Sequence, residues 1–122
     1  MKTKQGIKES DISLDEIKRQ IKGYAPSTDF SLLEKAYAFS SSAHEGQLRV
    51  SGEPFLHHPL AVAYILTELQ LPLSTIIAGL LHDVLEDTSV TRHQISKMFD
   101  EDVTLLVEGV TKIGQIKFRS ME

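Results

Sequence analysis

The sequence contains no cysteine, and this absence removes several kinds of chemistry at once. Disulfide bonds, thiolate metal ligands and a cysteine nucleophile are all excluded. No run reaches the roughly 18 consecutive apolar residues that a membrane-spanning helix needs. Residues 1–10 also lack the apolar stretch of a signal peptide. We therefore expect a soluble, cytoplasmic protein that does not bind membranes.

The sequence has fewer basic than acidic residues, 13 Lys and Arg compared with 17 Asp and Glu, which gives a net charge of -4. General attraction to nucleic acid is therefore not expected, and an anionic substrate would have to be held by local charges. With 122 residues, of which 41% are hydrophobic, the chain can build one core but has no room for a second.

No segment alternates polar and apolar residues, so the sequence predicts no strand. Apolar residues instead recur at helical spacing in six segments: 13–23, 30–43, 60–69, 74–88, 91–99 and 100–114. Capping-box patterns at Ser13 and Thr91 begin the first and the fifth of these segments. Gly46, Gly52 and Pro54 mark residues 44–59 as a long, turn-rich loop. The fold class predicted is an all-α bundle of about six helices.

Residues 74–88 combine an apolar run with four ionisable side chains. Ser74 is a good N-cap residue, and the run continues to His82, Asp83, Glu86 and Asp87. On one helix, residues four apart share a face, so these four side chains would form one patch. Carboxylates crowded beside apolar residues are costly without a counter-charge, and a divalent cation would remove that cost.

Within this patch, His82 and Asp83 suit one metal ion, and the pair Glu86 and Asp87 is placed to handle protons or position water. The residues alone leave open that the patch is a solvated helix end. Proline is favoured at the first helical position, so His58, which precedes Pro59, would be the N-cap of the helix 60–69. Spacing does not choose between His57 and His58.

Four motifs together resemble one family: Arg49-x-Ser51-Gly52-Glu53-Pro54, His58-Pro59, Leu81-His82-Asp83 with Glu86-Asp87-Thr88, and Glu108-Gly109-Val110-Thr111-Lys112. In order and spacing they resemble the N-terminal hydrolase domain of the RelA/SpoT stringent-response enzymes, which are HD-domain metal phosphohydrolases. The resemblance covers about residues 25 to 120. It divides the chain into an N-terminal segment with a short helix, residues 1–24, and the N-terminal part of an HD hydrolase domain, residues 25–122.

The resemblance implies removal of the 3′-pyrophosphate from guanosine tetraphosphate or pentaphosphate (ppGpp or pppGpp), with release of GDP or GTP. It implies one bound manganese ion with His58, His82 and Asp83 as ligands, although zinc or iron also fits these ligand types. It further implies that Glu86 and Asp87 orient and activate the attacking water. Arg49, with Ser51 nearby, resembles the residue that contacts the guanine side of the nucleotide.

The sequence departs from the family pattern in two ways. Val50 stands where relatives often carry a basic or polar residue, and the fourth ligand of the family, an aspartate, would lie beyond residue 122. We therefore expect a fragment of the hydrolase domain, incomplete at its C-terminus and without the synthetase and regulatory domains. We expect weak or absent activity of this fragment, an empty or partly occupied metal site, and self-association through the last helix. The parent protein is expected to associate with the ribosome. A short stand-alone HD nucleotide phosphohydrolase and a catalytically silent nucleotide-binding module are the alternatives.

Overall fold

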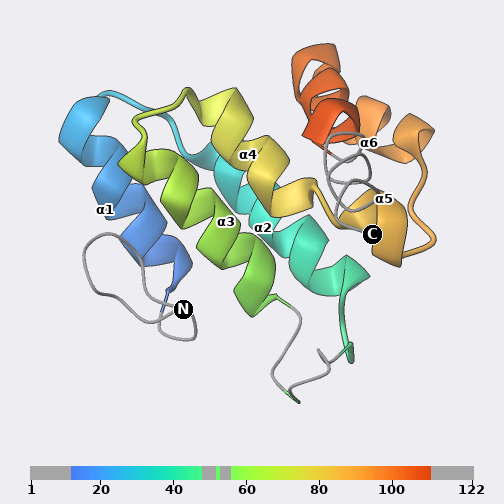
Figure 1. The fold of residues 1–122 in the computed structure, drawn as a ribbon. Helices are drawn as coiled ribbons and strands as arrows, with labels where there is room; N and C mark the ends of the chain where they lie inside the picture. The colour runs from blue at the N-terminus through green and yellow to red at the C-terminus, as the bar shows by residue number, and fades with distance from the viewer. Residues whose placement is uncertain (1–11, 48–51, 53–55, 111–122) are drawn as a thin grey trace, which may run out of the picture.

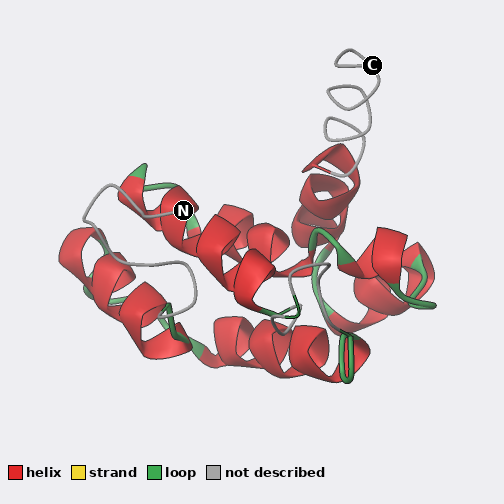
Figure 2. Cartoon of the chain, turned by 60° about the horizontal axis from the view of Figure 1, so that its bottom comes forward, coloured by secondary structure: helices red, strands yellow, loops and turns green. Residues whose placement is uncertain are grey.

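The computed structural model describes residues 12–47, 52 and 56–110, and every regular element in these ranges is a helix (Figures 1 and 2). The all-α class predicted from the sequence is confirmed. The labelled helices are α1 (Leu14–Tyr24), α2 (Ser31–Ala43), α3 (His57–Glu68), α4 (Leu73–Leu81), α5 (Val84–Asp87) and α6 (Arg92–Met98). Residues 101–110 are also helical. None of the described helices is both long and apolar enough to cross a membrane.

Two helices begin at the capping residues that the sequence predicted. The Ser13 hydroxyl accepts a hydrogen bond from the Glu16 backbone N–H at the start of α1. At the start of α6, Thr91 and Gln94 satisfy each other's backbone N–H groups in a complete capping box. Such a cap contributes about 1 kcal/mol by satisfying N–H groups that have no partner inside the helix.

The antiparallel hairpin of α3 and α4 forms the centre of the fold. Helix α1 packs against α3, and α2 packs against α4 (Figure 1). Two small residues, Ala63 on α3 and Gly79 on α4, allow the hairpin helices to approach closely. A Cβ atom on Gly79 would lie 3.6 Å from the Ala63 Cα and 2.7 Å from the Leu66 Cδ1. Because the link between the helices is short, the start of α3 and the end of α4 lie at the same end of the hairpin.

The single helix predicted over residues 74–88 is wrong. Helix α4 begins one residue earlier, after Pro72, and no side chain caps it, so the prediction of Ser74 as its N-cap is wrong too. The chain leaves regular helix at His82 and Asp83 and resumes as the single turn α5. The apolar run continues on both sides of the break, so hydrophobic periodicity carries no trace of it.

The prediction for the start of α3 also needs correction. The helix begins at His57, with Leu56 as the N-cap, so His58 lies inside the first turn and not at the cap. Pro59 is then the third helical residue. Proline fits there because the first four backbone N–H groups of a helix have no intrahelical partner to lose.

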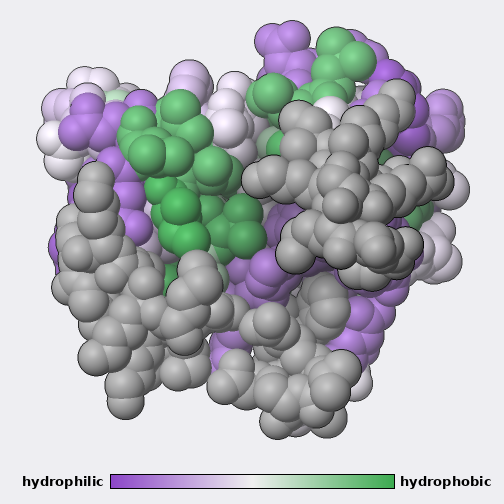
Figure 3. Space-filling model, viewed as in Figure 1, coloured by the Kyte–Doolittle hydropathy of each residue, from purple (hydrophilic) through white to green (hydrophobic). Residues whose placement is uncertain are grey.

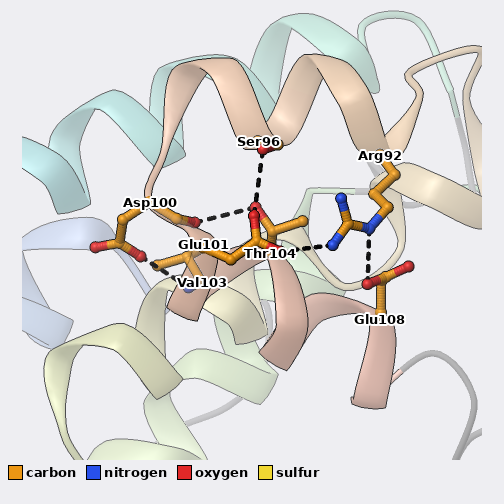
Figure 4. Close-up of polar contacts among 7 residues, drawn as sticks. All are labelled: Arg92, Ser96, Asp100, Glu101, Val103, Thr104 and Glu108. Atoms are coloured by element: carbon orange, nitrogen blue, oxygen red, sulfur yellow. Dashed lines mark hydrogen bonds and ion pairs between the residues drawn. The ribbon is translucent and has the colours of Figure 1, made fainter.

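A polar cluster joins α6 to the helix over residues 101–110 (Figure 4). The Arg92 guanidinium contacts the carboxylates of Glu101 and Glu108 at 2.7 and 2.9 Å. The Asp100 carboxylate accepts a hydrogen bond from the Val103 N–H at 2.8 Å and so caps that helix. Exposed ion pairs contribute little stability each, so the cluster mainly sets how the two helices lie.

Some apolar side chains of the described residues remain at the surface. On the face shown in Figure 3 they gather over α3 and around the helix 101–110. Leu69 and Leu105 are the large exposed hydrophobic residues among those described, whereas Val103 and Val107 are fully buried. The last helix therefore exposes only part of its apolar residues, and self-association through it stays a prediction.

Candidate metal centre

Three side chains converge at one end of the α3–α4 hairpin. His58 comes from the first turn of α3, His82 follows the last residue of α4, and Asp83 precedes α5. The Asp83 Oδ2 lies 3.4 Å from the His58 Nε2 and 3.1 Å from the His82 Nε2. One donor atom from each residue lies within 4.8 Å of the other two. The structure thus brings together the three residues that the sequence singled out as metal ligands.

The orientation of the His82 ring is set by the backbone of its own helix. Its Nδ1 lies 2.6 Å from the Gly79 carbonyl oxygen, which can only accept, so we assign the proton to Nδ1. Nε2 then carries a lone pair on the side of Asp83. A histidine held through one nitrogen by a backbone carbonyl, with the other nitrogen directed at a site, is the usual arrangement of a metal ligand.

The donor set fits a divalent cation. Ligand atoms at about 2.1 Å from one ion are separated by about 3.0 Å in octahedral and about 3.4 Å in tetrahedral geometry, which brackets both measured separations. The Asp83 Oδ2 is buried, and no described residue gives it a hydrogen bond of good geometry. A buried carboxylate oxygen without such a bond is costly, and a cation would compensate it. The His58 and His82 rings meet edge-to-face beside Asp83, with their centroids 5.3 Å apart.

Comparison with known proteins identifies the family of this site. The model of the HD domain family matches residues 36–121, a range that includes all three converging residues. The chain belongs to the HD domain family.

Sequence identity to individual proteins shows which members of the HD domain family this chain resembles. The chain is 49% identical over 92 residues to a GTP pyrophosphokinase of Myxococcus xanthus, covering 75% of this chain and 12% of that protein. It is 45% identical over 105 residues to the bifunctional (p)ppGpp synthase/hydrolase SpoT of Escherichia coli K12, covering 86% of this chain and 15% of that protein. A guanosine-3′,5′-bis(diphosphate) 3′-pyrophosphohydrolase of Vibrio cholerae is 44% identical over 105 residues, with the same two coverages. The resemblance to RelA/SpoT enzymes is confirmed, and the chain spans less than a sixth of these relatives.

Opposing effects act on the pKa values of His82 and Asp83, the HD pair. Burial by itself lowers the pKa of His82, but contact with Asp83 and the hydrogen bond to the Gly79 carbonyl outweigh it and raise that pKa. Burial raises the pKa of Asp83, but the contact with His82 and the charges of nearby histidines lower it overall. The HD pair therefore favours a positive charge beside a carboxylate, and a bound cation would supply that charge in place of the proton.

The acidic pair Glu86 and Asp87 lies on α5, one turn after the HD pair. Burial raises the pKa of the Asp87 carboxyl, as do the negative charges of Asp83 and Glu86, against the opposite effect of His44 and His82. Asp87 thus holds a proton more readily than an isolated aspartate does. A carboxylate with this property beside a metal site is suited to accept a proton from water.

Two polar residues near the HD pair were missed by sequence reasoning. His44, buried at 3% exposure, places its Nδ1 3.1 Å from the Gln47 Oε1, and the Gln47 amide donates to the Asp87 carbonyl oxygen at 3.1 Å. The only sequence signal for this contact is that His44 and Gln47 are three positions apart at the end of a predicted helix. The predicted nucleotide contacts, Arg49 and Ser51, lie outside the described residues.

Proposed function

We propose that this HD domain is a manganese-dependent hydrolase that removes the 3′-pyrophosphate from guanosine tetraphosphate or pentaphosphate. The observation that carries the proposal is the convergence of His58, His82 and Asp83 on one point. The names of relatives support the substrate, because two of them are called a (p)ppGpp hydrolase and a guanosine-bis(diphosphate) pyrophosphohydrolase. The chain spans 12 to 15% of these relatives, so any further activity, a cytoplasmic location and ribosome contact stay predictions.

In this proposal His58, His82 and Asp83 hold the ion. A divalent cation held there would polarise a phosphoryl oxygen and lower the pKa of a water molecule. Among the available metals, manganese is the expectation that comes from the family resemblance, since one carboxylate and two imidazoles do not select among manganese, zinc and iron.

Hydrolysis adds water across the bond between phosphorus and the ribose 3′ oxygen. The site must therefore remove one proton from the water and return one to the departing oxygen. Asp87 is suited to the first task because burial and its acidic neighbours raise its pKa, and Glu86, the preceding residue, would orient the water. Arg49 and Ser51 would bind the nucleotide, and the positive charge of Arg49 would offset the acidic character of the site.

The test is pyrophosphate release from guanosine tetraphosphate by the purified 122-residue chain in saturating Mn²⁺. Hydrolysis is expected to be slow, so the chain is used in excess over substrate in a single-turnover assay. We expect equal amounts of GDP and pyrophosphate. Bound Mn²⁺ without pyrophosphate release would overturn the proposal of weak hydrolysis by this chain and favour a silent nucleotide-binding module.

The variant Glu86→Gln separates catalysis from metal binding. It should retain Mn²⁺ and lower the rate of hydrolysis by a factor on the order of 10² or more, because it removes a carboxylate that acts on the water. Glu45→Gln is the matched control, since Glu45 is exposed just beyond the end of α2. Loss of Mn²⁺ binding in Glu86→Gln would instead make Glu86 a metal ligand.

A further inference from the structure

Helix α2 and the turn after it donate two hydrogen bonds to residues on either side of the irregular stretch that carries the HD pair. The Ser40 hydroxyl donates to the Leu80 carbonyl oxygen at 3.1 Å, and both residues are fully buried. The Gln47 side-chain amide donates to the Asp87 carbonyl oxygen, also at 3.1 Å. Leu80 is two residues before His82, and Asp87 is the last residue of α5. The two bonds therefore bracket the HD pair.

The Gln47 amide is itself held in one orientation. The Nδ1 of the buried His44 lies 3.1 Å from the Gln47 Oε1, and the Gln47 N–H donates to the His44 carbonyl at 3.0 Å to close the turn. Gly46 has a φ of +78°, a conformation that glycine adopts without steric cost. With the oxygen of the amide engaged by His44, its nitrogen is directed to Asp87.

These bonds matter because α5 cannot hold its own position. It has four residues, a single turn, and a turn of this length is not stable alone in water. Its Asp87 N–H donates to the Asp83 carbonyl at 2.9 Å, so whatever fixes the Asp87 backbone also fixes the backbone of the metal ligand Asp83. At the other end, a fixed Leu80 carbonyl keeps the last turn of α4, and with it His82, in place.

We propose that Ser40 and Gln47 form an α2 brace, two positioning residues that hold His82 and Asp83 in the geometry that binds a divalent cation. The α2 brace rests on the proposed function, since that function assigns the cation to this pair. Partners that orient metal ligands typically change metal affinity by about 10- to 100-fold when they are removed. Neither residue has to touch the ion or the substrate.

The test measures Mn²⁺ affinity of the 122-residue chain by the electron paramagnetic resonance signal of free Mn²⁺. Ser40→Ala removes one hydroxyl, and Gln47→Met keeps the side-chain length but removes the amide. Each should weaken Mn²⁺ binding by about 10-fold at a temperature where circular dichroism shows the helices intact. A purely structural role would lower the melting temperature and leave the affinity of the folded chain unchanged.

Matched controls make the same chemical changes elsewhere. Ser42→Ala alters an exposed serine of the same helix α2. Gln70→Met alters an exposed glutamine with a left-handed φ of 56°. Methionine adopts this backbone conformation at the same steric cost as glutamine, because both side chains are unbranched. Both controls should bind Mn²⁺ as the unmodified chain does. Gln47→Glu keeps the acceptor for His44 but has no donor for the Asp87 carbonyl, so it should resemble Gln47→Met.

The outcomes separate the α2 brace from the proposed function. Folded Ser40→Ala and Gln47→Met chains with unchanged Mn²⁺ affinity would overturn the α2 brace alone. Mn²⁺ binding without hydrolysis in the unmodified chain would overturn the function alone, and absence of Mn²⁺ binding would overturn both. Should Ser40→Ala fail to fold, Ser40→Cys, of similar size and with a weaker donor, takes its place, and normal Mn²⁺ affinity in it would count against the Ser40 contact.

Discussion

Replacement of Gly79 by alanine tests whether the close contact between α3 and α4 sets the geometry of the metal site. The new Cβ atom would lie 2.7 Å from the Leu66 Cδ1, whereas ordinary van der Waals contacts begin at 3.4 Å. The Leu66 Cδ1 methyl group must therefore move away by 0.7 Å. Alanine gains about 1 kcal/mol over glycine in helix propensity, but overpacking a core typically costs about 1–3 kcal/mol. The Leu66 methyl is the end of a flexible side chain, which places the cost at the lower end of that range.

Gly23→Ala is the control, because Gly23 lies in α1 and a Cβ atom there would meet nothing within 4 Å. This variant should gain up to about 1 kcal/mol without a packing cost. Since the propensity gain is the same in both variants, Gly79→Ala should be less stable than Gly23→Ala by about 1 kcal/mol in urea unfolding followed by circular dichroism. It should also bind Mn²⁺ more weakly, since movement of α3 displaces His58 from the HD pair. Equal stability of the two variants would refute the contact.

Three further predictions concern single side chains. His82→Ala should abolish Mn²⁺ binding and hydrolysis together, whereas His93→Ala, at an exposed position, should leave both unchanged; metal binding by equilibrium dialysis checks this. Arg92→Ala should lower the melting temperature at low salt, and salt should reduce the difference, because the ion pairs of Arg92 are half exposed. Hydrogen bonds from Ser31 lower the pKa of Asp29 in the folded chain below its ordinary value of 3.8. The stability that the Asp29 carboxylate contributes is therefore present above pH 3.8 and is lost as the pH falls through the pKa of the folded state. Asp29→Asn should therefore flatten this acid limb of a pH series of melting temperatures.

The residue types of the site could be predicted from the sequence, but the backbone that presents them could not. His82 and Asp83 stand out because they interrupt an apolar run, and that signal is local. The helix break at the same two residues is not local, since the Leu80 carbonyl beside it is bonded by Ser40, forty positions earlier. A pattern of apolar residues that continues through the break cannot reveal it.

The choice between His57 and His58 shows the same limit. Both residues lie in the first turn of α3, so their spacing to Pro59 does not distinguish them. The packing of α3 against α4 does, because it brings the His58 Nε2 to 3.4 Å from the Asp83 Oδ2. The family resemblance anticipated His58, whereas the His44 and Gln47 contacts depend on a turn that neither periodicity nor motif describes.

The proposed metal centre depends on few segments of the chain, because the start of α3 and the end of α4 lie at the same end of the hairpin. His58 starts α3 and His82 ends α4, and the short link between these helices makes the pairing of the two ends a local event. What the hairpin lacks is a means of fixing Asp83, which lies beyond its last helical residue. That task falls to α2 through Ser40 and Gln47, so three helices, and not the hairpin alone, are the smallest unit expected to bind the ion. Weaker Mn²⁺ binding on disturbing either the Gly79 contact or the α2 brace would follow from this arrangement, because the first positions His58 and the second positions His82 and Asp83.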